Sequence, residues 1–291
     1  MVTFSDATAS REGAERFINV ASPTFLENWP LGLRKLSVRQ TDVRLSRMQC
    51  AGILRYLKLR DIGAVDNVAT NPFAINRLDD AIESIRPRLN TALRSYYRGA
   101  YLRFGSRSPK DSAHGLRYGF RVRSAQQSLA IILTSRERVR FDLAVAHLAG
   151  YQSHLFLREW INVPQWKEFR CFMLGRQLRG ISQYHYTEGV TYPGIVANAN
   201  DIRRSLSSFF TKFRDASHLD DVIFDVAFNE SSDPILIEIN PSSKSGLSDL
   251  CLFHGMQLDG RFRFLGDGHD YKRVCRARSA RVSPSSLSGA E

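Results

Sequence analysis

Apolar residues recur every three or four positions between residues 78 and 93, which is the spacing of one helix face. They are Leu78, Ile82, Ile85, Leu89 and Leu93. Pro87 lies inside this stripe, and proline interrupts the hydrogen bonding of a helix. The pattern therefore predicts a kinked helix or two shorter helices here, within a first hundred residues that are mainly helical.

The pattern changes after residue 99, where a short strand and a loop rich in Gly, Ser and Pro are predicted up to residue 112. Ser124 is placed to cap a helix that runs through Leu133, because a serine hydroxyl accepts hydrogen bonds from the first amides of a helix. A second helix is expected at about 138–147.

From residue 154 onward the pattern favours strands bounded by turn residues. Strands are predicted within 154–163, 168–174, 178–186, 221–228 and 234–239. The short link from Gly175 to Gln177 indicates a hairpin. A loop is expected at 185–200, followed by a helix at about 202–214.

These elements predict an α+β fold, with a helical N-terminal part and a mostly antiparallel C-terminal sheet. We expect a first lobe over 1–150, a second lobe over 151–278 and a disordered polar tail over 279–291.

Composition is that of a folded chain, with 43% hydrophobic and 24% charged residues. No apolar run reaches the ~18 residues that a membrane-spanning helix needs, and the N-terminus lacks the pattern of a secretory signal. The four cysteines are far apart in sequence, which argues against a zinc site or a disulfide scaffold. A cytoplasmic location is expected.

The net charge of +12 is the unusual feature of the composition. It indicates a polyanionic partner, such as RNA or a phosphate-rich ligand, or an acidic protein. The alternative is a protein that is basic without such a partner.

Carboxylates interrupt the last two apolar strands at Asp225 and Glu238, and the alternation of a strand places Glu238 and Asn240 on one face. A buried carboxylate is costly unless it is paired or bound to a metal, and these oxygen ligands suit Mg²⁺. Alternatively, the two carboxylates face solvent or pair with arginines.

Two further features are weaker indications of ligand binding. The loop from Arg103 to Lys110 combines small residues with cations, as anion-binding loops do, although a surface loop of this composition is also common. Trp160 offers a flat apolar surface for a base, next to Arg158, and the alternative is a core tryptophan. Glu168 and Arg170 can form an ion pair instead of contacting a ligand.

Several other chemistries are disfavoured. The sequence has no HExxH, no GxSxG and no GxxxxGK[ST], so a zinc hydrolase, a serine hydrolase and a Walker-type nucleotide site are not indicated.

Taken together and in order, the motifs resemble the cell division cycle protein 123 family. They are FLENWP (25–30), RFGSRSPKDS, TSRERVRFDL, LFLREWI, EFRCFML, LRGISQYHY, VIFDVAF and LIEINP. The similarity runs from about Trp29 to Phe253 and is densest over 154–241. Members of this family are divergent ATP-grasp proteins, and the eukaryotic ones assist assembly of a translation initiation factor.

The resemblance implies an ATP-grasp-like fold of two lobes with ATP between them, and it assigns roles to matching residues. The implied metal ligands are Asp225, Glu238 and Asn240. The implied nucleotide contacts are Arg103, Ser106, Arg158, Glu159, Trp160, Ile161, Arg170 and Gln183, and the implied catalytic set is Arg103, Arg170, Asp225 and Glu238. The sequence has Arg103 where the family has lysine, Gly105 and Ser106 where it has an Asn-Trp pair, and Glu238 where aspartate is usual.

The function predicted from the resemblance is that of an ATP- and Mg²⁺-dependent ATP-grasp enzyme with ligase-type chemistry on a macromolecule. Two alternatives are an RNA ligase or RNA-end-modifying enzyme, which fits the excess of cations, and a non-catalytic ATP-binding chaperone that assembles a translation factor. Replacing Asp225 or Glu238 by alanine is expected to abolish Mg²⁺-dependent ATP binding and to leave the fold intact.

Overall fold

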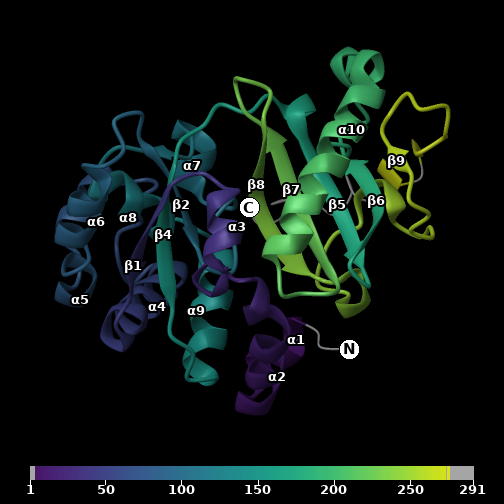
Figure 1. Cartoon of the computed structure of the whole chain (residues 1–291). Coiled ribbons are helices and arrows are strands. Elements are labelled where there is room, and N and C mark those ends of the chain that lie inside the picture. Colours follow the sequence, from purple (N-terminus) through teal and green to yellow (C-terminus); the bar gives the residue numbers. More distant parts are fainter. Residues whose placement is uncertain (1–3, 273, 276–291) are drawn as a thin grey trace, which may run out of the picture. The chain divides into compact units, whose positions relative to one another are not determined.

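The computed structural model of the chain describes residues 4–272 and 274–275, and it has two compact units (Figure 1). Unit 1 is Met1–Pro30 with Val38–Ile161, and unit 2 is Leu31–Ser37 with Asn162–Glu291. The chain leaves unit 1 after Ile161 and not after the predicted residue 150, because strand β4 (His154–Glu159) pairs with strands of unit 1. The tail predicted at 279–291 lies outside the described residues.

Unit 1 combines a small antiparallel sheet with helices packed around it. The strands are β1 (Gln40–Arg44), β2 (Ala100–Phe104), β3 (Arg121–Val122) and β4, in the order β1-β4-β2-β3. The helices are α1 (Phe4–Ala9), α2 (Arg11–Ala21), α4 (Arg47–Asp61), α5 (Asp80–Glu83), α6 (Arg86–Leu93), α7 (Ala113–Tyr118), α8 (Ala125–Leu133) and α9 (Arg138–Leu148), with short 3₁₀ turns at Ser22–Thr24, Leu26–Asn28 and Pro72–Asn76.

The apolar stripe over residues 78–93 forms two helices, α5 and α6, and Pro87 lies in the first turn of α6, where its missing N–H costs nothing. The predicted cap of α8 is confirmed, since the Ser124 hydroxyl accepts a hydrogen bond from the amide of Gln127 at 3.2 Å. Helix α9 also starts where the sequence predicts it.

The two faces of the unit 1 sheet differ in character. Leu155 and Leu157 of β4 join the main apolar core with α4, α6 and α8. Because side chains alternate along a strand, Phe156 and Arg158 project from the other face, and Arg103 of β2 lies opposite Phe156 there. Two buried arginines, Arg103 and Arg158, therefore share one face of this sheet.

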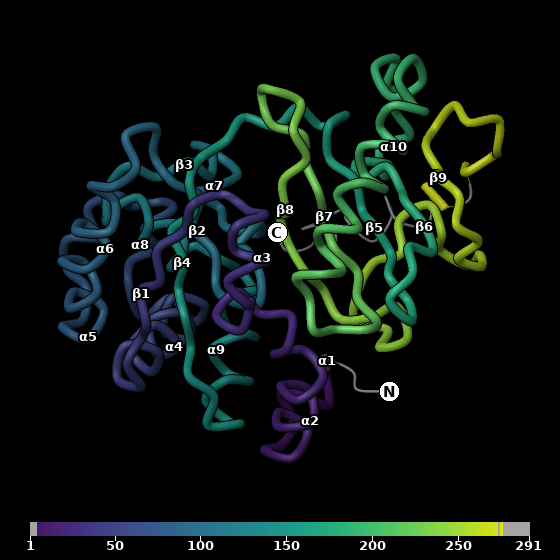
Figure 2. Tube along the Cα trace, in the orientation of Figure 1, coloured from purple at the N-terminus to yellow at the C-terminus, as the bar shows by residue number. Residues whose placement is uncertain are grey.

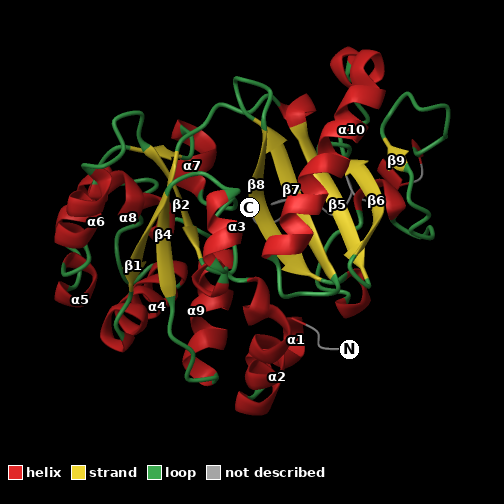
Figure 3. Ribbon diagram, in the orientation of Figure 1, coloured by secondary structure: helices red, strands yellow, loops and turns green. Residues whose placement is uncertain are grey.

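Unit 2 contains a five-stranded sheet in the order β8-β7-β5-β6-β9 (Figure 3). The strands are β5 (Glu168–Leu174), β6 (Gln177–Gln183), β7 (Val222–Phe228), β8 (Pro234–Pro241) and β9 (Phe262–Arg263), and only β6 with β9 is parallel. The helices are α3 (Leu31–Lys35) and α10 (Pro193–Ala216), with 3₁₀ turns at Gln165–Lys167, Ser243–Ser245 and Cys251–Phe253. The β5–β6 hairpin is confirmed, and its turn residues Gly175 and Arg176 both have positive φ.

Helix α10 covers one face of this sheet and runs across its strands (Figure 2). The Phe213 ring stacks on Phe224 of β7 with 4.0 Å between centroids. The helix begins at Pro193, earlier than the predicted residue 202, because a proline suits the first turn, and the backbone at Asn198 departs from helical geometry. The loop predicted up to residue 200 is correspondingly shorter.

No helix among the described residues is long and apolar enough to cross a membrane. All four cysteines lie in the described part of the chain, where they are buried free thiols.

Candidate functional site

An ion pair lies on the face of the unit 2 sheet that α10 does not cover. Arg170 of β5 stands directly opposite Asp225 of β7, and the side chains of such a cross-strand pair share one face. Arg170 Nε donates to Asp225 Oδ1 and Nη2 donates to Oδ2, both at 2.7 Å. Phe224, the neighbour of Asp225, packs on α10, so the pair points the other way.

Strand β8 adds a second carboxylate and an amide to the same face. Glu238 lies opposite Asp225, and Asn240 lies opposite Ile223, two residues away. The Asn240 amide donates to Asp225 Oδ2 at 3.4 Å. The register shifts by one residue beside Asp225, between Leu236 and Glu238 of β8. The structure thus brings Asp225, Glu238 and Asn240 together, and the shared face of Glu238 and Asn240 is the one that strand alternation predicts.

Two neighbours that the sequence analysis did not single out hold Arg170 in place. Its Nη1 donates to the backbone oxygen of Asp249 at 2.9 Å, and its guanidinium lies 5.0 Å from the centre of the Tyr184 ring. The Asp249 carboxylate accepts bonds from the Tyr186 hydroxyl and the Cys251 amide. No local signal marks Asp249, because the contact with Arg170 spans 79 residues.

The ion pair sets the electrostatics of this face. Burial alone lowers the pKa of Arg170, but the charge and hydrogen bonds of Asp225 hold that pKa well above the usual value. Burial raises the pKa of Asp225, and Arg170 opposes that shift. The predicted partner of Arg170, Glu168, bonds instead to His185 at 2.9 Å.

The donor set on this face suits a magnesium ion only in part. In the described residues, no three His, Cys, Asp or Glu side chains converge to hold a metal. Asp225, Glu238 and the Asn240 amide do converge, which is two carboxylates and one neutral oxygen donor. This is the set with which proteins hold Mg²⁺ when a nucleotide supplies further oxygens. Asp225, Glu238 and Asn240 therefore fit a nucleotide-bound metal as ligands.

In unit 1, the cation-rich loop is held by its own backbone and by a buried acid. Arg103 Nε and Nη2 donate to the backbone oxygens of Phe104 and Ser106, both at 3.1 Å. The Ser106 hydroxyl donates to Asp142 of α9 at 2.5 Å, and Arg107 pairs with the same carboxylate at 2.7 Å. The predicted nucleotide contacts Arg103 and Ser106 are thus both tied into the loop.

Two acids beside this loop were missed by the sequence analysis: Asp142, whose side chain is 7% exposed, and the half-buried Glu27. Burial raises the pKa of both. Glu27 accepts from the Tyr151 hydroxyl at 3.0 Å, and a Cβ on Gly105 would meet its carboxylate. An acid flanked by Phe141 and Leu143 in a helix is a signal that could have found Asp142.

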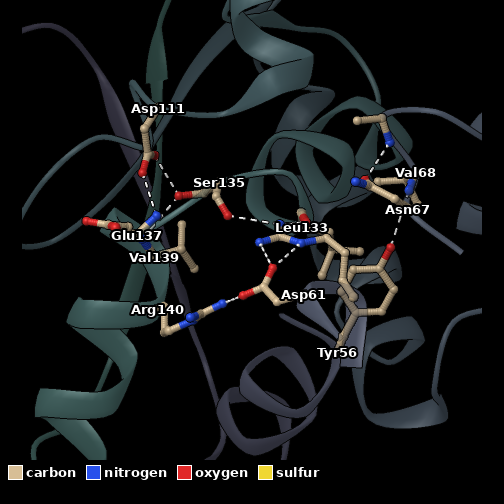
Figure 4. Close-up of polar contacts among 12 residues, drawn as sticks. Tyr56, Asp61, Asn67, Val68, Asp111, Leu133, Ser135, Glu137, Val139 and Arg140 are labelled. Carbon is tan, nitrogen blue, oxygen red and sulfur yellow. Dashed lines mark hydrogen bonds and ion pairs between the residues drawn. The ribbon is translucent and has the colours of Figure 1, made fainter. Parts of the chain in front are cut away.

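The far end of the loop is fixed by Asp111 (Figure 4). Its carboxylate accepts from the Ser135 hydroxyl at 2.6 Å and from the amides of Glu137 and Arg138 at the start of α9. Burial by itself raises the pKa of Asp111, but these hydrogen bonds outweigh burial and hold the pKa below its usual range. The loop is therefore anchored at both ends.

The stretch Arg158–Ile161 ends unit 1. The Arg158 guanidinium is buried and lies 6.0 Å from the Trp29 ring centre. Trp160 is partly buried, 6.4 Å from Tyr101 between ring centroids and 5.9 Å from the Arg121 guanidinium. It is thus not a core tryptophan. Contact of Arg158, Glu159, Trp160 or Ile161 with a nucleotide stays a prediction.

Gln183 is fully buried at the end of β6. Its amide nitrogen donates to the backbone oxygens of His185 and Val190, and its oxygen accepts from the amide of Leu265 at 3.0 Å. The bonds to His185 and Val190 hold the loop that follows β6. Contact of Gln183 with a nucleotide stays a prediction, and it would compete with these bonds.

The chain matches the model of the D123 family over residues 69–283. The chain belongs to the D123 family. This confirms the resemblance to the cell division cycle protein 123 family, and the match extends over both units.

Two relatives are named as translation initiation factor eIF2 assembly proteins. The protein of Xenopus tropicalis is 35% identical over 100 residues, which are 34% of this chain and 29% of that protein. The protein of Xenopus laevis is 34% identical over 100 residues, which are 34% and 28% of the two chains. The match thus spans less than a third of the length of these curated relatives.

The solved structure of Cdc123 from Schizosaccharomyces pombe has a similar fold. It aligns with a TM-score of 0.57 and 20% identity, covering 80% of this chain and 85% of that one. This likeness confirms the predicted α+β fold and its similarity to the fold of Cdc123.

Proposed function

We propose that this D123 protein binds ATP with Mg²⁺ and uses the bound nucleotide in a non-catalytic role, the assembly of a protein partner. The observation that carries the nucleotide site is the convergence of Arg170, Asp225, Glu238 and Asn240 on one face of the unit 2 sheet. One arginine side chain can bind two phosphate oxygens at once through parallel N–H groups, and carboxylates bind the accompanying metal.

The assembly role is supported by the names of the relatives, which are eIF2 assembly proteins. The proposed partner is therefore a subunit of a translation initiation factor or a similar protein. The prediction of an RNA partner rests on the net charge alone, and the names of the relatives do not support it. A protein partner is therefore preferred.

The residues have distinct proposed tasks at this site. The metal, when bound, neutralises phosphate charge and orients the triphosphate. Glu238 and Asn240 hold it from β8, Asp225 from β7, and Arg170 faces the phosphates. For Arg103, Arg158 and Trp160, contact with a nucleotide stays the prediction made from the family resemblance.

The test is calorimetric titration of ATP into the full chain with and without Mg²⁺. Glu238→Gln removes a proposed ligand charge and is expected to abolish the gain in ATP affinity that Mg²⁺ gives to the unchanged chain. Asp201→Asn is the matched control, because this exposed acid lies on α10, which covers the other face of the sheet. Equal Mg²⁺ dependence in both variants would contradict the site.

A ligase is the second candidate function, and it is favoured by the Glu238-Ile239-Asn240 pattern, which resembles that of catalytic ATP-grasp enzymes. The two functions differ in their products. The assembly role predicts that labelled ATP stays intact when it is incubated with the chain and a candidate partner. Release of ADP would indicate phosphoryl transfer, and release of AMP would indicate nucleotidyl transfer.

A further inference from the structure

Both oxygens of Asp225, a proposed metal ligand, are occupied by an arginine of the same unit. The two bonds from Arg170 are 2.7 Å long, and the side chains are 7% and 1% exposed for Arg170 and Asp225. A bidentate, charge-assisted pair of this kind is among the stronger hydrogen-bonded arrangements in proteins. The carboxylate therefore has a resident cation where a metal ion is expected.

Arg170 is fixed in this position from several sides. Strand pairing places its backbone opposite Asp225, its Nη1 bonds to the Asp249 backbone oxygen, and the Tyr184 ring lies beside the guanidinium. Three of its nitrogen atoms have partners, two on Asp225 of β7 and one on the loop residue Asp249, so moving the side chain away from Asp225 costs hydrogen bonds.

The charges on this face have a consequence for metal binding. The guanidinium of Arg170 offsets the negative charge of Asp225, which would otherwise attract a divalent cation. A metal ion must also compete with Arg170 for the oxygens of Asp225. Free Mg²⁺ gives up its water reluctantly and gains little in such a site.

We propose that Arg170 closes the metal site to free Mg²⁺ and that a nucleotide opens it, because the phosphates take the guanidinium over from Asp225. This inference rests on the proposed nucleotide site. Arginine serves carboxylate and phosphate with the same planar pair of donors, so the exchange keeps its hydrogen bonds. By linkage, ATP and Mg²⁺ each raise the affinity for the other.

The test needs no nucleotide. Mn²⁺, the spectroscopic stand-in for Mg²⁺, is titrated alone into the full chain and followed by electron paramagnetic resonance. We expect Arg170→Met to bind Mn²⁺ on the order of 10- to 100-fold more tightly than the unchanged chain, since it removes a nearby positive charge and frees both oxygens. No gain in affinity would overturn the proposal.

The double variant Arg170→Met/Asp225→Asn is the matched control, because it also lacks the arginine but offers no Asp225 charge. It is expected to bind Mn²⁺ no more tightly than the unchanged chain, and a gain equal to that of Arg170→Met would contradict the role of Asp225.

Arg170→Met leaves a buried carboxylate without its cation, so Arg170→Lys provides a second measurement. Lysine keeps the charge but not the paired bonds, and an Mn²⁺ affinity between those of the unchanged chain and Arg170→Met is expected. A lysine variant that matches the unchanged chain contradicts competition for the oxygens. Failure of ATP to bind the unchanged chain would instead refute the proposed function, because these titrations contain metal alone.

Discussion

The buried arginines of the two units have different kinds of partner. Arg103 in unit 1 and Arg170 in unit 2 are 3% and 5% exposed. Arg103 bonds to two backbone oxygens of its own loop, whereas Arg170 bonds to the side chain of Asp225 on the neighbouring strand. Arg103 thus shapes a loop beside Asp142, whose pKa its charge lowers, and Arg170 is paired directly with the carboxylate of Asp225. Substitutions that remove the partners of Arg170 or the donors of Arg103 should therefore lower the free energy of unfolding by different amounts.

The largest effect is expected at Asp225. Asp225→Ala leaves the buried Arg170 without its counter-charge and should lower the free energy of unfolding by about 3–5 kcal/mol, measured by urea denaturation. The buried pair thus replaces the expectation of an intact fold with the prediction of a destabilised one. The double variant Arg170→Met/Asp225→Asn removes both charges and should recover much of the loss; a double variant as unstable as Asp225→Ala would refute the charge argument.

A smaller effect is expected at Arg103. Arg103→Met leaves the backbone oxygens of Phe104 and Ser106 without these donors, which should lower the free energy of unfolding by about 1–3 kcal/mol. Amide hydrogen exchange in the loop from Gly105 to Lys110 should also become faster. The control Arg203→Met, at an exposed position of α10, should stay within about 0.5 kcal/mol of the unchanged chain. A loss at Arg103 with unchanged loop exchange would show that the arginine does not shape the loop.

The smallest effect concerns the acids of unit 1, which have hydroxyl partners. Burial holds the pKa of Glu27 above its unfolded value of 4.5. The stability that this group contributes is therefore fully present below 4.5 and is lost as the pH rises through the folded pKa. Glu27→Gln keeps an oxygen for the Tyr151 hydroxyl but cannot ionise, so the urea midpoint of this variant should fall less between acid and neutral pH.

Glu12→Gln, at an exposed position of α2, is the control for the pH experiment and should follow the unchanged chain. If Glu27→Gln follows it too, the carboxylate of Glu27 does not carry the pH dependence.

The elements that the sequence predicts correctly have local signals. Ser124 caps α8, Pro87 opens α6, and the Gly175–Arg176 turn joins β5 to β6. Strand β1 was not predicted, because it is a short edge strand whose only fully buried side chain is Val43. The place of α3 in unit 2 was not predicted either, since its neighbour Ala216 is remote in sequence.

The same limit applies to the candidate site. The shared face of Glu238 and Asn240 follows from strand alternation, which can be predicted from a few residues. The bond between Arg170 and Asp225 depends on β5 and β7 being neighbours, and the sequence pattern does not contain that order. From the sequence, Asp225 could either pair with an arginine or bind a metal. In the structure it is paired with Arg170.

The register shift between Leu236 and Glu238 makes β8 sensitive to chain length. Counted from the turn between β7 and β8, regular pairing would place Ile237 opposite Asp225, and Glu238 would then face α10 with Phe224. A deletion of one residue there would carry Glu238 and Asn240 together through the sheet to its apolar side. Homologues that conserve the chemistry of this face should therefore vary in the length of the turn at Asn229–Asp233 and not between Leu236 and Asn240.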